Sequence, residues 1–280
     1  MDNETIVFAI RNVNLHTHSW YCGHGEGELV EYVSAAIKDG LQVLGFSEHC
    51  PMPNERWAMI RMPFSFLNNY LDECKALQRT HKEITLLTGL ECDYDPFFHS
   101  WYKEYLIKEK EVDYLSFAVH FLQHSSGRDE YLQEFPSEKK FLHAYTDAYI
   151  EGLSSGLFRF GVHPDLFGCF YKEWDEEAIA CSRSIFECAS SYNIPLEING
   201  SGLHKPPIST TKGKRPLYPL IPFWTLAKEY PLTIIGSSDA HRPQVVKAYV
   251  DDAHEFAKKI NLKIETSLII DRDGKMIFSN

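Results

Sequence analysis

Residues 12–33 read NVNLHTHSWYCGHGEGELVEYV and place His16, His18 and His24 within nine residues. The stretch before these histidines is apolar and strand-like, and residues 29–40 after them have the spacing of an amphipathic helix that closes at a glycine. Side chains two apart on a strand point to the same face, so His16 and His18 are aimed together. One histidine beside a strand is more typical of packing or of the surface. Three so close together indicate a binding site.

Six further parts of the chain contain short apolar runs of the same kind, which are typical of buried strands. The seven predicted strands span residues 6–16, 41–49, 84–94, 112–121, 157–165, 194–200 and 232–241. The segments between them have helical spacing, and strands that alternate with helices predict parallel pairing in an α/β fold.

Polar residues lie at the end of nearly every predicted strand, namely His16, His18, His49, Glu91, His120, His163, Asn199, Asp239 and His241. In a parallel barrel all the C-terminal strand ends face the same way, so residues remote in sequence converge there. An open doubly wound sheet would spread them along a crevice. We therefore expect a barrel. It forms a single domain over residues 1–280, because no repeat, linker or change of composition marks a boundary.

Composition and charge restrict the class of protein. The chain has 280 residues, 44% of them hydrophobic, and a net charge of −11. An acidic surface repels phosphate backbones, so we expect no nucleic-acid partner. The first residues have neither a basic leader nor a long apolar run, which predicts a cytoplasmic protein without a membrane span. The seven cysteines are scattered without a C-x-x-C pair, which favours reduced thiols.

The mixture of imidazole and carboxylate groups at the strand ends indicates a metal centre. Such groups suit borderline ions such as Zn, Mn, Fe or Co, and a bridging carboxylate is the usual means of holding two ions close together. Glu91 is the candidate bridge. Asp239 and His241 are two residues apart and form a second pair of donors aimed together.

These residues resemble the signature of the polymerase and histidinol phosphatase (PHP) superfamily of metal phosphoesterases. The matching segments read HTHSWYCGH from residue 16, SEH from 47, GLECD from 89, AVH from 118, GVHPD from 161 and SDAH from 238. The resemblance thus runs from residue 16 to residue 241, and all nine ligand positions are filled by suitable residues.

The resemblance implies a distorted seven-stranded β/α barrel of the TIM-like kind, with three divalent transition-metal ions at its mouth. One ion would take His16, His18, Glu91 and Asp239. A second would share Glu91 and take His120 and His163, and a third would take His24, His49 and His241. Glu91, Asp239 and His241 would be the catalytic residues among these ligands.

Within the superfamily, the segments GFSEHCPMP, GLECDY and GVHPDLF look most like those of stand-alone L-histidinol-phosphate phosphatases. This implies hydrolysis of a small phosphate monoester, histidinol phosphate, in histidine biosynthesis by attack of a metal-bridging hydroxide. Two alternatives stay open. The same site could act on another small phosphate ester or nucleotide, or the chain could be a non-catalytic metal-binding regulator.

Residues outside the metal site are predicted to contact the substrate. Arg159, which we place on the inward face of the strand that ends at His163, is the first candidate for the phosphate, because guanidinium groups bind phosphate in a planar fork. Arg215 is the second, from a basic loop in an otherwise acidic chain. Asn199 and His204 are further candidates. Metal-bound water, Glu48 or His204 could protonate the leaving group.

Overall fold

The computed structural model describes residues 6–123, 128–264, 266–271 and 275–279. Seven strands form one sheet in the order β12-β9-β8-β5-β4-β3-β2, and every pairing within it is parallel. The strands are β2 (Val13–Asn14), β3 (Val43–His49), β4 (Thr85–Asp93), β5 (Tyr114–Ala118), β8 (Phe160–Gly161), β9 (Leu196–Asn199) and β12 (Ile234–Ser237). They are rich in apolar residues because a parallel sheet is covered on both faces.

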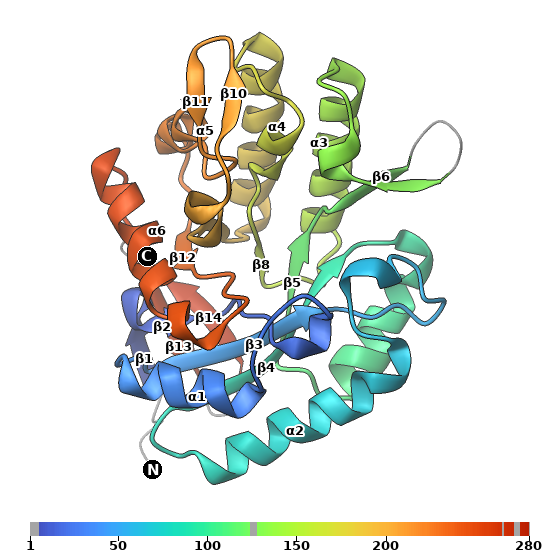
Figure 1. Cartoon of the computed structure of the whole chain (residues 1–280), viewed down its shortest axis with the longest axis vertical. Helices are drawn as coiled ribbons and strands as arrows, with labels where there is room; N and C mark the ends of the chain where they lie inside the picture. The colour runs from blue at the N-terminus through green and yellow to red at the C-terminus, as the bar shows by residue number, and fades with distance from the viewer. Residues whose placement is uncertain (1–5, 124–127, 265, 272–274, 280) are drawn as a thin grey trace.

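Two contacts between the edge strands close this sheet into a barrel. Thr17, just after β2, forms a parallel bridge with Ala240, just after β12, and the backbone N–H of His18 donates to the carbonyl of Ala240 over 2.8 Å. Figure 1 shows the strands in the middle of the molecule, with helices above and below them. The predicted parallel α/β barrel is therefore confirmed, while its assignment to a single domain stays a prediction.

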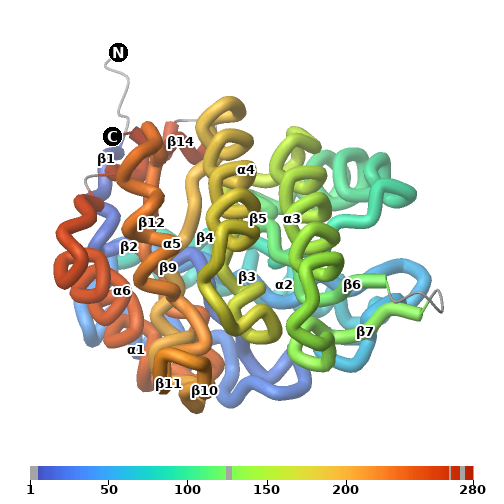
Figure 2. Tube along the Cα trace, turned by 90° about the horizontal axis from the view of Figure 1, so that it is seen from above, coloured from blue at the N-terminus to red at the C-terminus, as the bar shows by residue number. Residues whose placement is uncertain are grey.

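Helices surround the barrel, as Figure 2 shows in a view from above. They are α1 (Leu29–Lys38), α2 (Leu67–Thr80), the π-helix η6 (Trp101–Glu109), α3 (Lys139–Ser154), α4 (Glu176–Tyr192), α5 (Ile221–Leu226) and α6 (Ala248–Lys259). Local sequence sets several of their ends. Asp175 caps α4 by accepting from the N–H of Ala178 over 3.0 Å, and Asn193 ends that helix in the left-handed conformation. No helix in the described ranges combines the length and apolar character needed to cross a bilayer.

The first predicted strand, residues 6–16, is wrong as a single element. It is split into β1 (Ile6–Ala9) and β2 by a 3-10 turn at Ile10–Asn12, and β1 belongs to a separate antiparallel sheet with β13 (Ser267–Ile270) and β14 (Met276–Ser279). Phe8, Leu268 and Met276 of this second sheet pack against residues inside the barrel. One continuous strand would leave that end of the barrel uncovered.

Tyr114 shows how tightly the barrel interior is filled. Its hydroxyl donates to the carbonyl oxygens of Leu15, over 2.8 Å, and Phe46, over 3.2 Å, and its ring lies against Gly45 and Gly89. A side chain at either glycine would collide with the ring. The two glycines therefore allow the Tyr114 ring to pack directly against the backbones of β3 and β4. The hydrogen bonds of Tyr114 link the β2 and β3 segments just beneath the strand ends that carry the histidines.

Two hairpins complete the described fold. The first pairs β6 (Phe121–Gln123) with β7 (Asp129–Tyr131), and the second pairs β10 (Ile208–Thr210) with β11 (Gly213–Arg215). Both follow strands whose ends contribute predicted site residues.

Candidate metal centre

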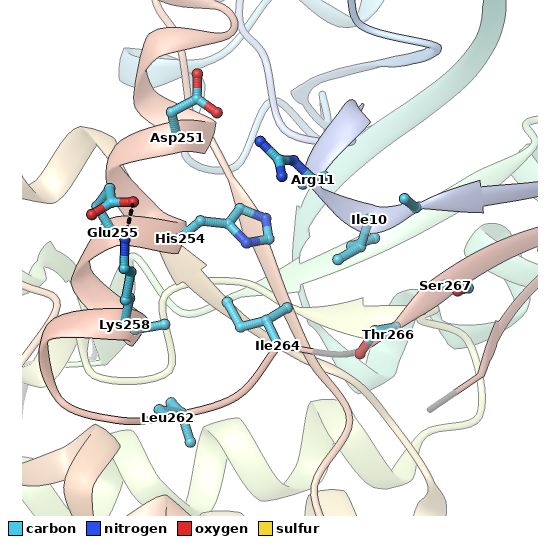
Figure 3. A pocket seen from close by; sticks show the side chains of 12 residues that line it. Ile10, Arg11, Asp251, His254, Glu255, Lys258, Leu262, Ile264, Thr266 and Ser267 are labelled. Carbon is cyan, nitrogen blue, oxygen red and sulfur yellow. Dashed lines mark hydrogen bonds and ion pairs between the residues drawn. The ribbon is translucent and has the colours of Figure 1, made fainter.

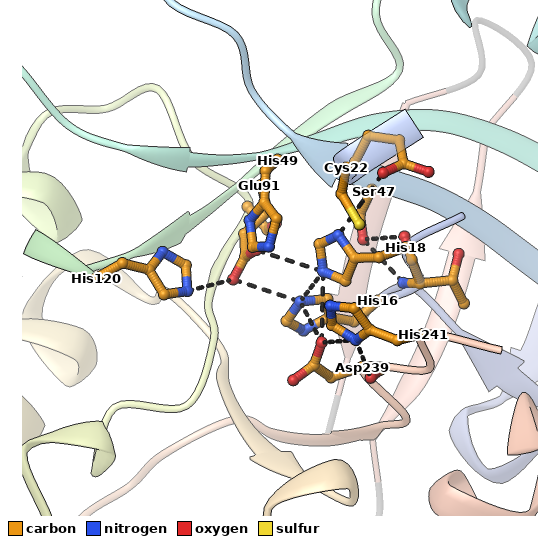
Figure 4. A network of polar contacts seen from close by, with 12 residues as sticks. His16, His18, Cys22, Ser47, His49, Glu91, His120, Asp239 and His241 are labelled. Atoms are coloured by element: carbon orange, nitrogen blue, oxygen red, sulfur yellow. Dashed lines mark hydrogen bonds and ion pairs between the residues drawn. The ribbon is translucent and has the colours of Figure 1, made fainter. Parts of the chain in front are cut away.

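The fold brings all nine predicted metal ligands to one end of the barrel, as Figure 4 shows for most of them. Eight of the nine lie at or just after the C-terminal end of a strand, where a parallel barrel concentrates functional residues. His24 reaches the same place from the loop after β2. A side chain at Gly25 would collide with the backbone oxygens of His18 and Ser19, so glycine there lets the loop fold back against the site.

Glu91 is the centre of the cluster. Its carboxylate is 1% exposed. Oε1 lies 3.0 Å from His163 Nε2, 3.4 Å from His16 Nε2 and 3.6 Å from His120 Nε2, and Oε2 lies 2.7 Å from His49 Nδ1 and 3.4 Å from His18 Nε2. A carboxylate with histidine nitrogens on both oxygens has the geometry expected of a ligand shared between ions.

Asp239 forms the second acidic position. Its Oδ1 lies 3.4 Å from His18 Nε2, 3.6 Å from His16 Nε2 and 3.4 Å from His241 Nδ1. The backbones of Asp239 and His163 have φ of +50° and +30°, a region that costs a residue with a side chain about 1–3 kcal/mol. Strain at two of the nine positions indicates that the surrounding structure holds these side chains in place for function.

The structure brings the donors of all three predicted ion sites close together, and His49 lies within 4.8 Å of His241 in the third. His16, His18, Glu91 and Asp239 form one group, and Glu91 also lies within 3.6 Å of His120 and His163. For the third site, His24 Nε2 lies 3.0 Å from His241 Nε2. His49, however, directs its Nδ1 to Glu91 Oε2.

Buried acids orient several of the histidines from behind. Glu197 Oε1 lies 2.7 Å from His16 Nδ1, and its Oε2 accepts from the backbone N–H of His163 over 3.0 Å. Asp93 Oδ2 lies 3.0 Å from His120 Nδ1. Such carboxylate–histidine pairs fix the ring orientation and raise the basicity of the nitrogen that faces a metal.

Burial and neighbouring charges divide the histidines into two kinds. Burial lowers the pKa of His49 to about 3 and, with nearby imidazoles, lowers the pKa of His18. Burial alone would also lower the pKa of His16, but the charges of Glu197, Glu91 and Asp239 outweigh it and raise that pKa. Histidines with lowered pKa are neutral at pH 7 and can bind a cation at once.

The residues present fit a divalent metal centre. His18 Nδ1 is a buried atom without a hydrogen-bond partner in the described chain, and His49 Nδ1 and Glu91 Oε2 lie 2.7 Å apart without the geometry of a hydrogen bond. Buried polar atoms are costly unless something pairs with them. Imidazole nitrogens and carboxylate oxygens are the donors that borderline divalent metals prefer, so the cluster is a candidate metal centre.

A cavity of about 250 Å³ opens directly above these ligands. Beyond the ligands, it is lined by Ile60, Tyr131, Gln133, Leu166, Lys205, Leu217 and Tyr218. Lys205 is the only lysine or arginine among the described residues that line it. Lys205 belongs to the same basic loop as Arg215, and no pattern in the sequence distinguishes it from the other basic residues there.

A larger cavity of about 700 Å³ lies elsewhere, between α6 and the sheet of β1 and β13, and Figure 3 shows its lining. Arg11, Asp251, His254 and Glu255 are among its residues, but none of the nine ligands is. Size alone would select this cavity, whereas the chemistry is concentrated at the smaller one.

The structure does not place Arg159 at the cavity, so its predicted role in phosphate binding is not supported. Arg159 is exposed and precedes β8, whereas His163 follows that strand. At about 3.3 Å per residue, the four intervening steps place Arg159 near the opposite end of the barrel. Sharing a strand face with a ligand is not enough, because the position along the strand also decides what a side chain can reach.

Arg215 and His204 also have partners other than the cavity. The Arg215 guanidinium donates to backbone carbonyls, among them Gly168 over 2.9 Å and Pro216 over 2.9 Å, so it fastens the β10–β11 hairpin. His204 pairs with Asp252 over 2.7 Å and stacks on Tyr249. Neither lines the cavity above the ligands.

Glu48 and Asn199 lie behind the ligands. Glu48 is fully buried, accepts from the N–H and hydroxyl of Ser19, and does not line the cavity. It points away because it is next to His49 on β3, and neighbouring strand residues face opposite sides. Its predicted role as leaving-group acid is therefore not supported. Asn199 donates to Asp239 and Glu197 over 3.2 Å each and does not line the cavity.

Arg61 and Asp93 form a buried pair that sequence reasoning did not find. Arg61 Nη2 donates to Asp93 Oδ2 over 2.8 Å. The same carboxylate accepts from the backbone N–H of His120 and contacts Nδ1 of the His120 ring. The only sequence signal was the position of Asp93, two residues after Glu91 on the same strand.

A parallel barrel that presents nine imidazole and carboxylate groups at its C-terminal end defines a metal-dependent barrel enzyme. The PHP domain family model matches residues 14–201. The chain belongs to this family.

Two named relatives support this assignment. A probable histidinol-phosphatase of Deinococcus radiodurans is 30% identical over 247 residues, which cover 85% of this chain and 89% of that protein. A probable histidinol-phosphatase of Schizosaccharomyces pombe is 25% identical over 279 residues, covering 85% of this chain and 86% of that protein.

Among solved structures, one from Lactococcus lactis has a TM-score of 0.69 at 19% identity and covers 95% of this chain and 98% of that chain. It is a histidinol phosphate phosphatase complexed with zinc, L-histidinol and phosphate. This likeness establishes that the two chains share a fold.

Proposed function

We propose that the protein is a histidinol-phosphatase, which hydrolyses L-histidinol phosphate to L-histidinol and phosphate in histidine biosynthesis. The observation that supports this most is the nine-ligand cluster beneath a cavity of about 250 Å³, a size that suits a small phosphate ester. The relatives named above, which match most of the chain, are the reason for preferring histidinol phosphate over other esters.

The proposed centre holds three divalent ions of the Zn, Mn, Fe or Co type. His16, His18, Glu91 and Asp239 would hold one, Glu91 with His120 and His163 a second, and His24, His49 and His241 the third. When bound, such ions supply Lewis acidity and lower the pKa of coordinated water to about 7. Glu91, Asp239 and His241, which all line the cavity, stay the proposed catalytic residues.

The residues of the cavity wall have separate tasks in this proposal. Lys205 binds the phosphoryl group, because it is the one cationic side chain among the described lining residues. Burial raises the pKa of Tyr131 and Tyr218, so both hydroxyls keep their protons and can donate hydrogen bonds to phosphoryl oxygens. Ile60, Leu166 and Leu217 limit the access of bulk water.

A substrate comparison tests the proposal. Phosphate release is measured with histidinol phosphate, nucleotides and sugar phosphates on protein of known metal content. We expect histidinol phosphate to have the highest kcat/KM by at least about tenfold. Equal values for several esters would instead indicate a general phosphatase. Bound metal without turnover of any ester would indicate a metal-binding regulator.

We also propose that the protein works in the cytoplasm. All seven cysteines are unpaired in the structure, and six of them are buried. Unpaired thiols are typical of a reducing compartment.

A further inference from the structure

The contact between His24 and His241 differs from the others in the cluster. Their Nε2 atoms lie 3.0 Å apart. On the far side of each ring, Nδ1 lies 3.1 Å from a backbone carbonyl oxygen, that of Cys22 for His24 and that of Asp239 for His241. A carbonyl oxygen can only accept, so each Nδ1 carries a proton and each neutral ring has a lone pair at Nε2. Two lone pairs that face each other at this distance can both bind one metal ion.

Cys22 is the third donor at this position. Its sulfur lies within 4.8 Å of the donor nitrogens of both His24 and His241, and Figure 4 shows it beside the histidine cluster. The residue is 2% exposed. The N–H of Gly25 donates to the sulfur over 3.1 Å, and the sulfur lies 3.2 Å from the carbonyl oxygen of Ser19. Among the described residues, no other cysteine belongs to such a donor group.

We propose that Cys22 is a direct thiolate ligand of the ion between His24 and His241. As the sulfur–metal bond forms, the S–H bond breaks and its proton passes to water. This position of the centre then combines sulfur with nitrogen donors, whereas the others use nitrogen and oxygen. Soft thiolate ligands favour zinc over manganese or magnesium. The inference rests on the metal centre of the proposed function and is independent of the substrate.

Cobalt(II) is the probe for this thiolate. The metal-free full-length chain is loaded with cobalt(II), and its near-ultraviolet spectrum is recorded. We expect a sulfur-to-cobalt charge-transfer band in the unaltered chain and in Cys188→Ser, because Cys188 lies on α4 beside the carbonyl of Ile150. We expect Cys22→Ser to lose the band. A spectrum without the band in the unaltered chain, or one that persists in Cys22→Ser, would overturn the proposal.

X-ray absorption at the zinc edge gives an answer that needs no variant. The zinc-loaded chain should show a sulfur scatterer at about 2.3 Å in addition to nitrogen and oxygen at shorter distance. Only nitrogen and oxygen scatterers would refute the role of Cys22, even if Cys22→Ser failed to fold. A chain that shows the sulfur scatterer but does not hydrolyse histidinol phosphate would refute the substrate and leave the ligand assignment intact.

Discussion

Glu197 Oε1 lies 2.7 Å from Nδ1 of His16, and both side chains are fully buried. The pair links the end of β9 to the residue that follows β2, across the seam where the barrel closes. Glu197 accepts a hydrogen bond from the Nδ1–H of His16. The Nε2 of that ring therefore faces Glu91 and His18. The barrel thus sets the tautomer of a metal ligand through a carboxylate that no metal needs to touch.

We predict that Glu197→Gln weakens metal binding while leaving the fold intact. The amide keeps the shape but loses the charge that raises the basicity of His16, so we expect about a tenfold to hundredfold loss of affinity for the ion at His16. Titration of the metal-free protein with zinc against a competing chelator measures this. Glu187→Gln, an exposed position on α4, is the matched control. Equal affinities of the two variants would show that Glu197 has only a packing role.

Glu91→Ala should lose at least one equivalent of metal and nearly all phosphatase activity. One substitution removes the carboxylate that lies within 3.6 Å of five histidines, so at least two ion positions lose a donor. Elemental analysis and phosphate release, measured on the same sample, check this. Full metal content with full turnover in Glu91→Ala would contradict a shared ligand.

Lys205→Met should reduce kcat/KM by about tenfold to a hundredfold and leave the metal content unchanged. This corresponds to the loss of a charge-assisted hydrogen bond of about 1.5–3 kcal/mol. Lys212→Met is the control, because Lys212 belongs to the β10–β11 hairpin and lines a different cavity. If both variants behave alike, the effect comes from general surface charge.

Arg159→Ala should leave kcat/KM within about twofold of the unaltered protein, because its side chain lies near the far end of β8 and away from the cavity. Steady-state kinetics with histidinol phosphate decides this. A rise in KM of tenfold or more would mean that Arg159 reaches the phosphate after all.

The metal-free protein should lose stability as the pH rises from 4.5 to about 8, partly because of Glu48. Burial raises the pKa of Glu48 to about 8. A carboxyl whose pKa is higher in the folded than in the unfolded state stabilises the fold fully at low pH, and this contribution is lost as the pH rises through the folded value.

Glu48→Gln should therefore flatten this part of the stability curve, which is measured as the unfolding midpoint at a series of pH values. Glutamine can still accept from Ser19 but does not ionise. An identical pH dependence in both proteins would exclude charging of Glu48 as the cause.

The sequence allowed the prediction of strands, helices and the convergence of ligands because these depend on local apolar runs and on the direction of parallel strands. The spacing of His16, His18, Asp239 and His241 defines which side chains point together, and the structure places them so. What could not be predicted depends on where each strand ends. Arg159 shares a strand with His163 but lies at its opposite end.

Contacts between residues that are distant in sequence could not be predicted either. Two of the carbonyl oxygens that accept from Arg215, those of Gly168 and Lys172, lie more than forty residues earlier, and no local sequence pattern indicates these contacts. The apolar alternation of residues 6–16 continues across the turn at Ile10–Asn12, so the break between two sheets has no clear local signal. Lys205 is distinguished from other lysines only by the cavity that it lines.

The central claim is that distant imidazoles and acids form one metal cluster at the barrel mouth and that this cluster performs the hydrolysis. The most direct measurement is phosphate release from histidinol phosphate before and after exhaustive chelation, followed by stepwise return of zinc or manganese with the metal content recorded at each step. We predict that activity disappears with the ions and returns in proportion to them. Full turnover by protein that retains far less than one equivalent of metal would contradict the account.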